Sequence, residues 1–151
     1  MAAMNPAHLH LAVCHLPVIG LAFSMLVNIY ALITKSKSTL RLSMILYVIS
    51  GACVALAFAT GDGAEKLLES SAGIGEDLIE PHEEMAMFFF IGLMLIAGAG
   101  IAALLTSWKD AGKLWKFNLF ILIAAALISI SAIRTAEKGG EIRHREIMLR
   151  E

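Results

Sequence analysis

The side chains in this sequence that are best suited to chemistry are its five histidines, at positions 8, 10, 15, 82 and 144. Imidazole changes its charge near neutral pH and is the commonest metal ligand in proteins. The sequence contains no Gly-x-Ser-x-Gly motif, no Walker-type phosphate loop and no C-x-x-C-H haem-attachment motif. The histidines therefore indicate ligation of a metal ion or a non-covalent cofactor rather than an enzymatic activity.

His15 is the N-terminal histidine that lies furthest into an apolar segment. It follows His8 by almost two helical turns, or about 10 Å along a helix axis. A polar group at such a depth in a membrane helix usually faces the interior of the bundle and has a partner there. Pro17 follows closely and frees the carbonyl of Val13 from its helical hydrogen bond, which loosens the backbone. We therefore expect His15 to face the interior and to serve as a ligand. His10 is the alternative ligand in its place.

His82 lies among carboxylates, in the segment 80–84 with the sequence Glu-Pro-His-Glu-Glu. Acidic side chains are favourable in the first turn of a helix, which explains the glutamates but not the histidine. Carboxylates also commonly orient metal-binding imidazoles, so Glu83 is a candidate to assist His82 or to join it as a ligand. Two residues complete the candidate set. His144 is a further metal ligand in the charged C-terminal segment, and Arg134 could pair with an acid or neutralise an anionic group of a cofactor.

Long apolar stretches surround these residues and predict a membrane protein. Hydrophobic residues make up 58% of the 151 residues, charged residues make up 17%, and the net charge is −1. Such a composition excludes a disordered chain, a disulfide scaffold and a general nucleic-acid binder. A hydrocarbon core about 30 Å thick needs about 20 helical residues, whose backbone groups must bond within the helix. Cutting the sequence at its charged residues predicts a single membrane domain, 1–151, with four spans at about 8–34, 42–60, 80–106 and 115–137.

Four crossings predict an all-α, antiparallel four-helix bundle with both termini on the same side of the membrane. The two short turns, at 35–41 and 107–116, are basic, whereas the loop 62–79 is acidic. Short basic loops stay in the cytoplasm, which places both termini, the acidic loop and the charged tail 139–151 outside. All five histidines then lie at the outer face. That they share one face depends only on the number of crossings and not on the orientation of the bundle.

Local signals predict where these helices begin and end. Thr60-Gly61 is typical of the turn that ends the second span, and Gly139-Gly140 of a stop after the fourth. Pro81 suits the first turn of the third helix, where its missing N–H costs nothing.

Small and polar residues recur on one face of the first predicted span. Gly20, Ser24 and Asn28 are spaced four residues apart, which predicts a packing face that ends in an amide needing a buried partner. We expect such faces to bring the helices into close contact.

These residues support three alternative functions. In the first, the bundle binds b-type haem near its outer face for electron transfer to or from a quinone or a periplasmic carrier. His82 and either His15 or His10 would be the axial ligands, and Arg134 would neutralise the propionates. In the second, the site holds a transition-metal ion without haem. The ligands of that ion would be His10, His15, His82, Glu83 and His144. In the third, the protein is a cofactor-free structural or accessory subunit of a membrane complex.

Several positions near the ends of the spans also match a known pattern. They are His10-x4-His15-x-Pro17, Thr60-Gly61, His82 and Gly139-Gly140. This set resembles the domain-of-unknown-function 2231 family, predicted four-helix membrane proteins of bacteria that often begin with a His-Pro-x-x-x-His-Phe-Pro stretch. The sequence departs from that stretch at Leu11 and Leu16. The resemblance implies a four-helix fold and a place in the bacterial inner membrane, but no agreed activity, so the function is argued from the site.

Overall fold

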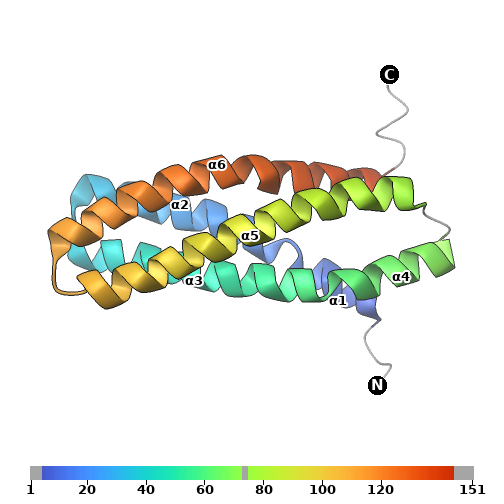
Figure 1. Ribbon diagram of the computed structural model, residues 1–151, viewed down its shortest axis with the longest axis horizontal. Helices are drawn as coiled ribbons and strands as arrows, with labels where there is room; N and C mark the ends of the chain where they lie inside the picture. Colours follow the sequence, from blue (N-terminus) through green and yellow to red (C-terminus); the bar gives the residue numbers. More distant parts are fainter. Residues whose placement is uncertain (1–4, 73–74, 145–151) are drawn as a thin grey trace.

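The computed structural model describes residues 5–72 and 75–144 of the chain, and every element in these two stretches is a helix (Figure 1). The helices are α1 (Pro6–Val13), α2 (Leu16–Thr34), α3 (Lys37–Ala59), α4 (Gly61–Ala72), α5 (Glu76–Ser107) and α6 (Ala111–Arg143). The prediction of an all-α fold is confirmed.

Four long helices, α2, α3, α5 and α6, lie side by side along the long axis of the molecule (Figure 1). α3 packs against both α2 and α5, α5 packs against α6, and α2 also contacts α6. The turns that join α2 to α3 and α5 to α6 lie together on the left of Figure 1, which we call the turn end (35–36 and 108–110). α1, α4, the start of α5 and the end of α6 lie at the opposite end, which we call the histidine end because it holds His10 and His82.

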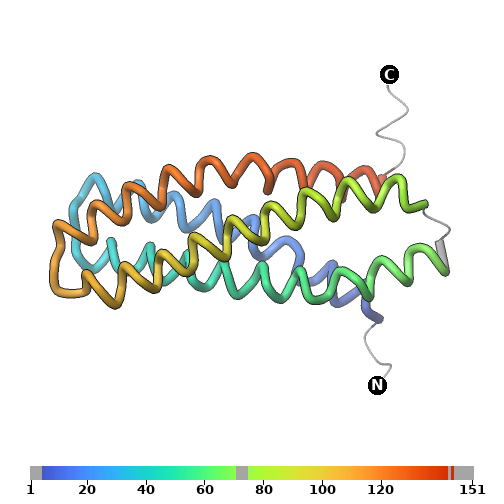
Figure 2. The backbone as a smooth tube through the Cα atoms, viewed as in Figure 1, coloured from blue at the N-terminus to red at the C-terminus, as the bar shows by residue number. Residues whose placement is uncertain are grey.

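Four helical stretches of the described chain are long and apolar enough to cross a membrane. They are Pro6–Thr34, Lys37–Ser70, Glu76–Ser107 and Ala111–Ile142. Each contains one predicted span and extends beyond it at the histidine end. The first stretch comprises α1 and α2, and the second comprises α3 and nearly all of α4, with a short interruption in each (Figure 2).

Small residues bring the helices into close contact, as their spacing predicts. A Cβ added at Gly51 of α3 would lie 2.5 Å from the Cβ of Ala97 on α5, closer than real Cβ atoms come. A Cβ at Gly20 of α2 would lie 2.7 Å from the hydroxyl of Ser50 on α3. The missing side chains thus let α3 approach α5 on one side and α2 on the other.

A polar network in the core joins α2, α3 and α6. Asn28 is completely buried, and its amide nitrogen donates to the hydroxyl of Tyr47 at 3.3 Å and to the carbonyl of Asn118 at 3.1 Å. Ser43 donates to the side-chain oxygen of Asn118 at 2.6 Å. The expected buried partner of Asn28 is therefore present. Such bonds fix the relative rotation of the three helices, because each polar group would be costly to leave unpaired in an apolar core.

The first predicted span is interrupted at Cys14 and His15, which separate α1 from α2. Pro17, at the start of α2, has no N–H with which to bond the carbonyl of Val13, so the helical ladder is broken there. The loosening predicted at Pro17 therefore appears as an interruption between two helices, α1 and α2.

The acidic segment predicted as the loop 62–79 is largely helical, so that prediction is wrong. α4 begins at Gly61, directly after Thr60, and α5 begins at Glu76. Ala64 is buried, and a Cβ at Gly63 would lie 3.1 Å from Pro6 at the start of α1. Gly63 thus allows α4 to pack closely against α1, whereas a Cβ at Gly61 would meet nothing within 4 Å.

Two further predicted helix ends are wrong for a related reason. Pro81 is not in the first turn of its helix but inside α5, which begins at Glu76. Gly139 and Gly140 do not stop α6, which continues to Arg143. Tertiary contacts override the local signal at Gly139, whose bare Cα faces α5. The rest of the predicted tail, 145–151, lies outside the described residues.

The turn end is held together by polar contacts between its two turns. Lys37 donates to the carbonyl of Lys109 at 2.8 Å, and Arg41 donates to the carbonyl of Trp108 and lies over its ring, 4.0 Å from the centroid. Because these cations bond to the carbonyls that end α5, they also complement the negative end of that helix dipole.

Candidate functional site

His10 of α1 and His82 of α5 both lie at the histidine end. Both are half-buried, and a weak electrostatic interaction links their rings. They come from helices far apart in the sequence, and α1 reaches this position by packing chiefly against α4. The histidine pair is therefore a product of the tertiary fold.

The ring of His82 is held by the backbone of α6. Its Nδ1 lies 3.0 Å from the carbonyl oxygen of Thr135, and since a carbonyl can only accept, Nδ1 carries the proton. The neutral ring then has its lone pair on Nε2. A backbone or carboxylate acceptor on one ring nitrogen is the usual way in which a metal-binding histidine is oriented, with the other nitrogen left to bind.

Gly139, one turn after Thr135, lets the His82 ring reach α6. A Cβ at Gly139 would lie 3.1 Å from Cε1 and 3.3 Å from Nδ1 of this ring. At the neighbouring Gly140 a Cβ would meet nothing within 4 Å. Of the two glycines, only the first is required by the histidine site.

His10 is oriented by the end of α3. Its Nδ1 lies 3.1 Å from the hydroxyl oxygen of Thr60, whose proton is engaged by the helix carbonyls of Ala57 at 2.8 Å or Leu56 at 3.2 Å. The hydroxyl therefore accepts from Nδ1 of His10, and the lone pair of this ring is again on Nε2. Both histidines thus have the same tautomer, in which Nδ1 is hydrogen-bonded and Nε2 is the nitrogen that can bind a ligand.

His15 does not face the bundle interior, so the expectation of its orientation is wrong. Its side chain is exposed at the break between α1 and α2, and its Nδ1 lies 3.2 Å from the sulfur of Cys14. It still interacts electrostatically with His10. Of the two N-terminal candidates, His10 is therefore the half-buried one.

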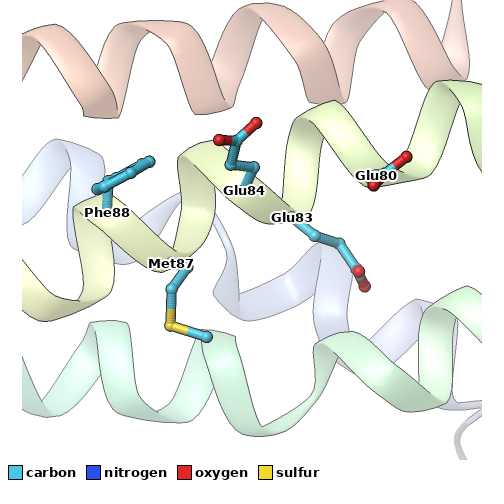
Figure 3. Close-up of a pocket in the computed structure, with 5 residues that line it drawn as sticks. All are labelled: Glu80, Glu83, Glu84, Met87 and Phe88. Carbon is cyan, nitrogen blue, oxygen red and sulfur yellow. The ribbon is translucent and has the colours of Figure 1, made fainter.

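The remaining candidate residues lie away from the histidine pair. Glu83 extends toward α4 (Figure 3), where it lies near Glu65 and not against His10 or His82. Arg134 is 61% exposed and pairs with Glu137 at 2.9 Å on the same helix, the safer of its two predicted roles. His144 is exposed at the end of α6, and His8 is exposed on α1.

The acidic side chains of α5 line an open groove on the exposed face of this helix. The groove is formed by Glu80, Glu83, Glu84, Met87 and Phe88 (Figure 3). Across residues 5–72 and 75–144, no group of three or more His, Cys, Asp or Glu side chains is arranged to hold a metal ion. The glutamates therefore do not complete a metal site with His82.

Three residues of this site were not predicted from the sequence. Thr135 contributes a backbone carbonyl, which every residue has, so no residue type reveals it. Thr60 and Gly139 were noticed, but as markers of helix ends. Their true roles depend on which helices become neighbours, and a single sequence does not contain that information.

The described residues define an all-helical protein with four potential membrane-spanning stretches and a pair of oriented histidines at one end. Comparison with protein families, with curated proteins and with solved structures finds no match to this chain.

Proposed function

We propose that this chain is a multi-pass protein of the bacterial inner membrane that binds b-type haem between His10 and His82 and transfers electrons. The proposal rests mainly on the matching tautomer and hydrogen bonding of the two imidazole rings. Each donates from Nδ1 to a fixed acceptor at 3.0–3.1 Å and keeps Nε2 for a ligand.

The outward faces of the long helices support the membrane part of the proposal. Ile33 is 75% exposed, Leu105 79% and Leu95 70%. Soluble proteins rarely leave such large apolar side chains in water over whole helices. A bilayer would cover them, and helices whose backbone groups bond internally are suited to that environment. We infer an antiparallel bundle with the short basic turns in the cytoplasm and both termini in the periplasm.

The number of protein ligands favours haem over a bare metal ion. A protein-bound transition metal usually needs three or four side-chain ligands, whereas a porphyrin supplies four nitrogens itself and leaves only two axial positions. The two histidines are enough for haem, and the described residues provide no third ligand beside them. When bound, the haem iron would accept and release one electron.

The chain's own residues would hold and orient the group. His10 replaces His15 as the partner of His82, and Arg134, paired with Glu137, is not needed at the propionates. His10 lies on a short helix that is separated from α2 by the break at residues 14–15. The position of His10 relative to His82 is therefore set by how α1 packs against α4 and α3. The redox partner would be a quinone in the bilayer or a periplasmic electron carrier.

A visible absorption spectrum tests the proposal directly. Protein purified in detergent from haem-replete cells should show a Soret band, and His10→Ala and His82→Ala should each remove most of it. His15→Ala is the matched control and should retain the band, because His15 is exposed and has no place in the pair. A colourless wild-type protein, or a band that survives His82→Ala, would overturn the proposal. Colourless protein that co-purifies with other membrane proteins would instead indicate an accessory subunit.

A further inference from the structure

A groove at the turn end, opposite the histidines, combines positive charge with exposed aromatic rings. It has a volume of about 370 Å³ and is lined by Lys113, Lys116, Phe117 and Phe120, all on the first turns of α6. Lys113 and Phe117 are four residues apart, and so are Lys116 and Phe120. Residues at this spacing lie on the same face of a helix, so each lysine stands one turn before a phenyl ring.

The two lysines are available to an external anion. The side chain of Lys113 is 68% exposed, and Asp110, with which it pairs, is 3.9 Å away, at the limit of an ion pair. Lys116 is exposed and forms no ion pair with a described residue. By contrast, Lys37 and Arg41 at the same end are bonded to backbone carbonyls. The charge of this groove is thus largely left exposed to an external anion.

The two phenylalanines give the groove an apolar floor further along α6. Phe120 is 65% exposed and Phe117 is half-buried. They lie toward the middle of the stretch Ala111–Ile142, while the lysines lie near its beginning. In a bilayer this order places ammonium groups near the headgroups and phenyl rings near the acyl chains.

We propose that this groove binds an anionic phospholipid of the surrounding bilayer. Lys113 and Lys116 contact the phosphate and the net negative charge of the headgroup, and one acyl chain lies along Phe117 and Phe120. A free phosphate ion would leave both rings exposed, and a zwitterionic lipid would gain less from the two charges. The inference rests on the membrane embedding proposed above, but not on haem binding.

Tryptophan fluorescence can measure this preference, because both tryptophans of the chain, Trp108 and Trp115, lie beside the turn end. The full-length protein is reconstituted in phosphatidylcholine vesicles that contain a small fraction of brominated phosphatidylglycerol or of brominated phosphatidylcholine. Bromine quenches tryptophan on contact, so stronger quenching by the anionic lipid reports its enrichment at this site. We expect the wild-type protein to prefer the anionic lipid, with each lysine contributing roughly a fivefold effect.

The double variant Lys113→Gln/Lys116→Gln should lose most of this preference, and Lys113→Arg/Lys116→Arg should keep it. Lys66→Gln removes one charge from α4 at the histidine end and should have no effect. An unchanged preference in the double glutamine variant, or an equal loss in Lys66→Gln, would overturn the lipid site. If neither brominated lipid quenches the wild-type protein, the membrane embedding itself is wrong, and the lipid site with it.

Discussion

At His82, a backbone carbonyl decides which ring nitrogen can bind a ligand. The bond from Nδ1 to Thr135 does not depend on the side chain at position 135, so substitutions there should leave the tautomer unchanged. His10 differs, because its acceptor is the hydroxyl of Thr60. The pair thus combines one ring fixed by the main chain with one fixed by a side chain.

Replacing Gly139 by alanine tests whether the glycine is needed for the His82 ring. Gly140→Ala is the matched control. It should stabilise the protein by about 0.5–1 kcal/mol, as expected for alanine in a helix interior. Gly139→Ala should gain less or lose stability, because its Cβ would lie 3.1 Å from the ring. Thermal unfolding in detergent, followed by circular dichroism, measures the difference.

The Soret band of the same two variants gives a second measurement, since only Gly139→Ala should reduce it. Equal stability and equal absorbance of the two alanine variants would contradict the role assigned to Gly139.

The sequence pointed to the histidines as candidate ligands but predicted the wrong one of them, His15, to be in the interior. His82 and His10 were both candidates, because imidazole in an apolar chain is informative by itself. His15 was preferred over His10 on the assumption that one helix continued through position 15. The break at residues 14–15 invalidates that assumption. The predicted link between Glu83 and His82 was likewise based on adjacency, whereas the fold sets Glu83 beside Glu65.

The long helices were predictable because charge-free runs of sufficient length are a robust signal in sequence. The ends of these helices were harder to predict. Inside a helix, glycine costs about 0.5–1 kcal/mol and proline about 3 kcal/mol of stability. Contacts between helices readily outweigh these costs at Gly139 and Pro81. The acidic segment after Thr60 was predicted to be a loop because it lies between two apolar spans, yet α4 forms there and packs on α1.

The start of α6 follows the usual rules of helix capping, and its capping residue predicts that the stability of the protein depends on pH. Asp110 caps α6 by accepting from the backbone N–H of Lys113 at 3.0 Å. This bond lowers the pKa of Asp110 below its ordinary value, with smaller contributions from the N–H of Gly112 and the charges of Lys113 and Lys116. The charged form is therefore the stabilising one. Its contribution is complete above the ordinary aspartate pKa of about 4 and is lost as the pH falls through the lower value of the folded protein.

Asp110→Asn removes the charge but keeps the cap, because asparagine retains an oxygen that can accept a hydrogen bond at the helix start. At pH 7 the variant should be slightly less stable than the wild type, and the difference should vanish at the acidic end of a pH series. Asp110→Ala, which removes the acceptor, should be the least stable of the three at pH 7. Melting temperatures in detergent between pH 7 and pH 3 measure these effects. A pH-independent gap between wild type and Asp110→Asn would contradict the assignment of charge to this cap.

On the scale of the whole molecule, the two ends differ in how their charges are used. At the histidine end, Arg134 and Lys138 each lie 2.9 Å from a glutamate on α6. At the turn end, Lys37 and Arg41 bond to carbonyls, and Lys113 and Lys116 are exposed beside aromatic rings. Among the described residues, Arg134 and Lys138 at the histidine end are thus paired with glutamates, whereas Lys116 at the turn end forms no ion pair.

This asymmetry predicts the orientation of the bundle, because short basic turns are retained in the cytoplasm. The test uses single cysteines in a Cys14→Ser/Cys53→Ser background, since these are the two cysteines of the chain. A membrane-impermeant thiol reagent added to intact cells with a permeabilised outer membrane should label Ser70→Cys on α4. It should label Gly112→Cys at the start of α6 only after the inner membrane is opened. The reverse pattern would place the histidine pair on the cytoplasmic side, and a periplasmic electron carrier could then no longer be its partner. Labelling of both positions in intact cells would contradict the membrane-spanning bundle itself, because the two positions lie at opposite ends of the long helices.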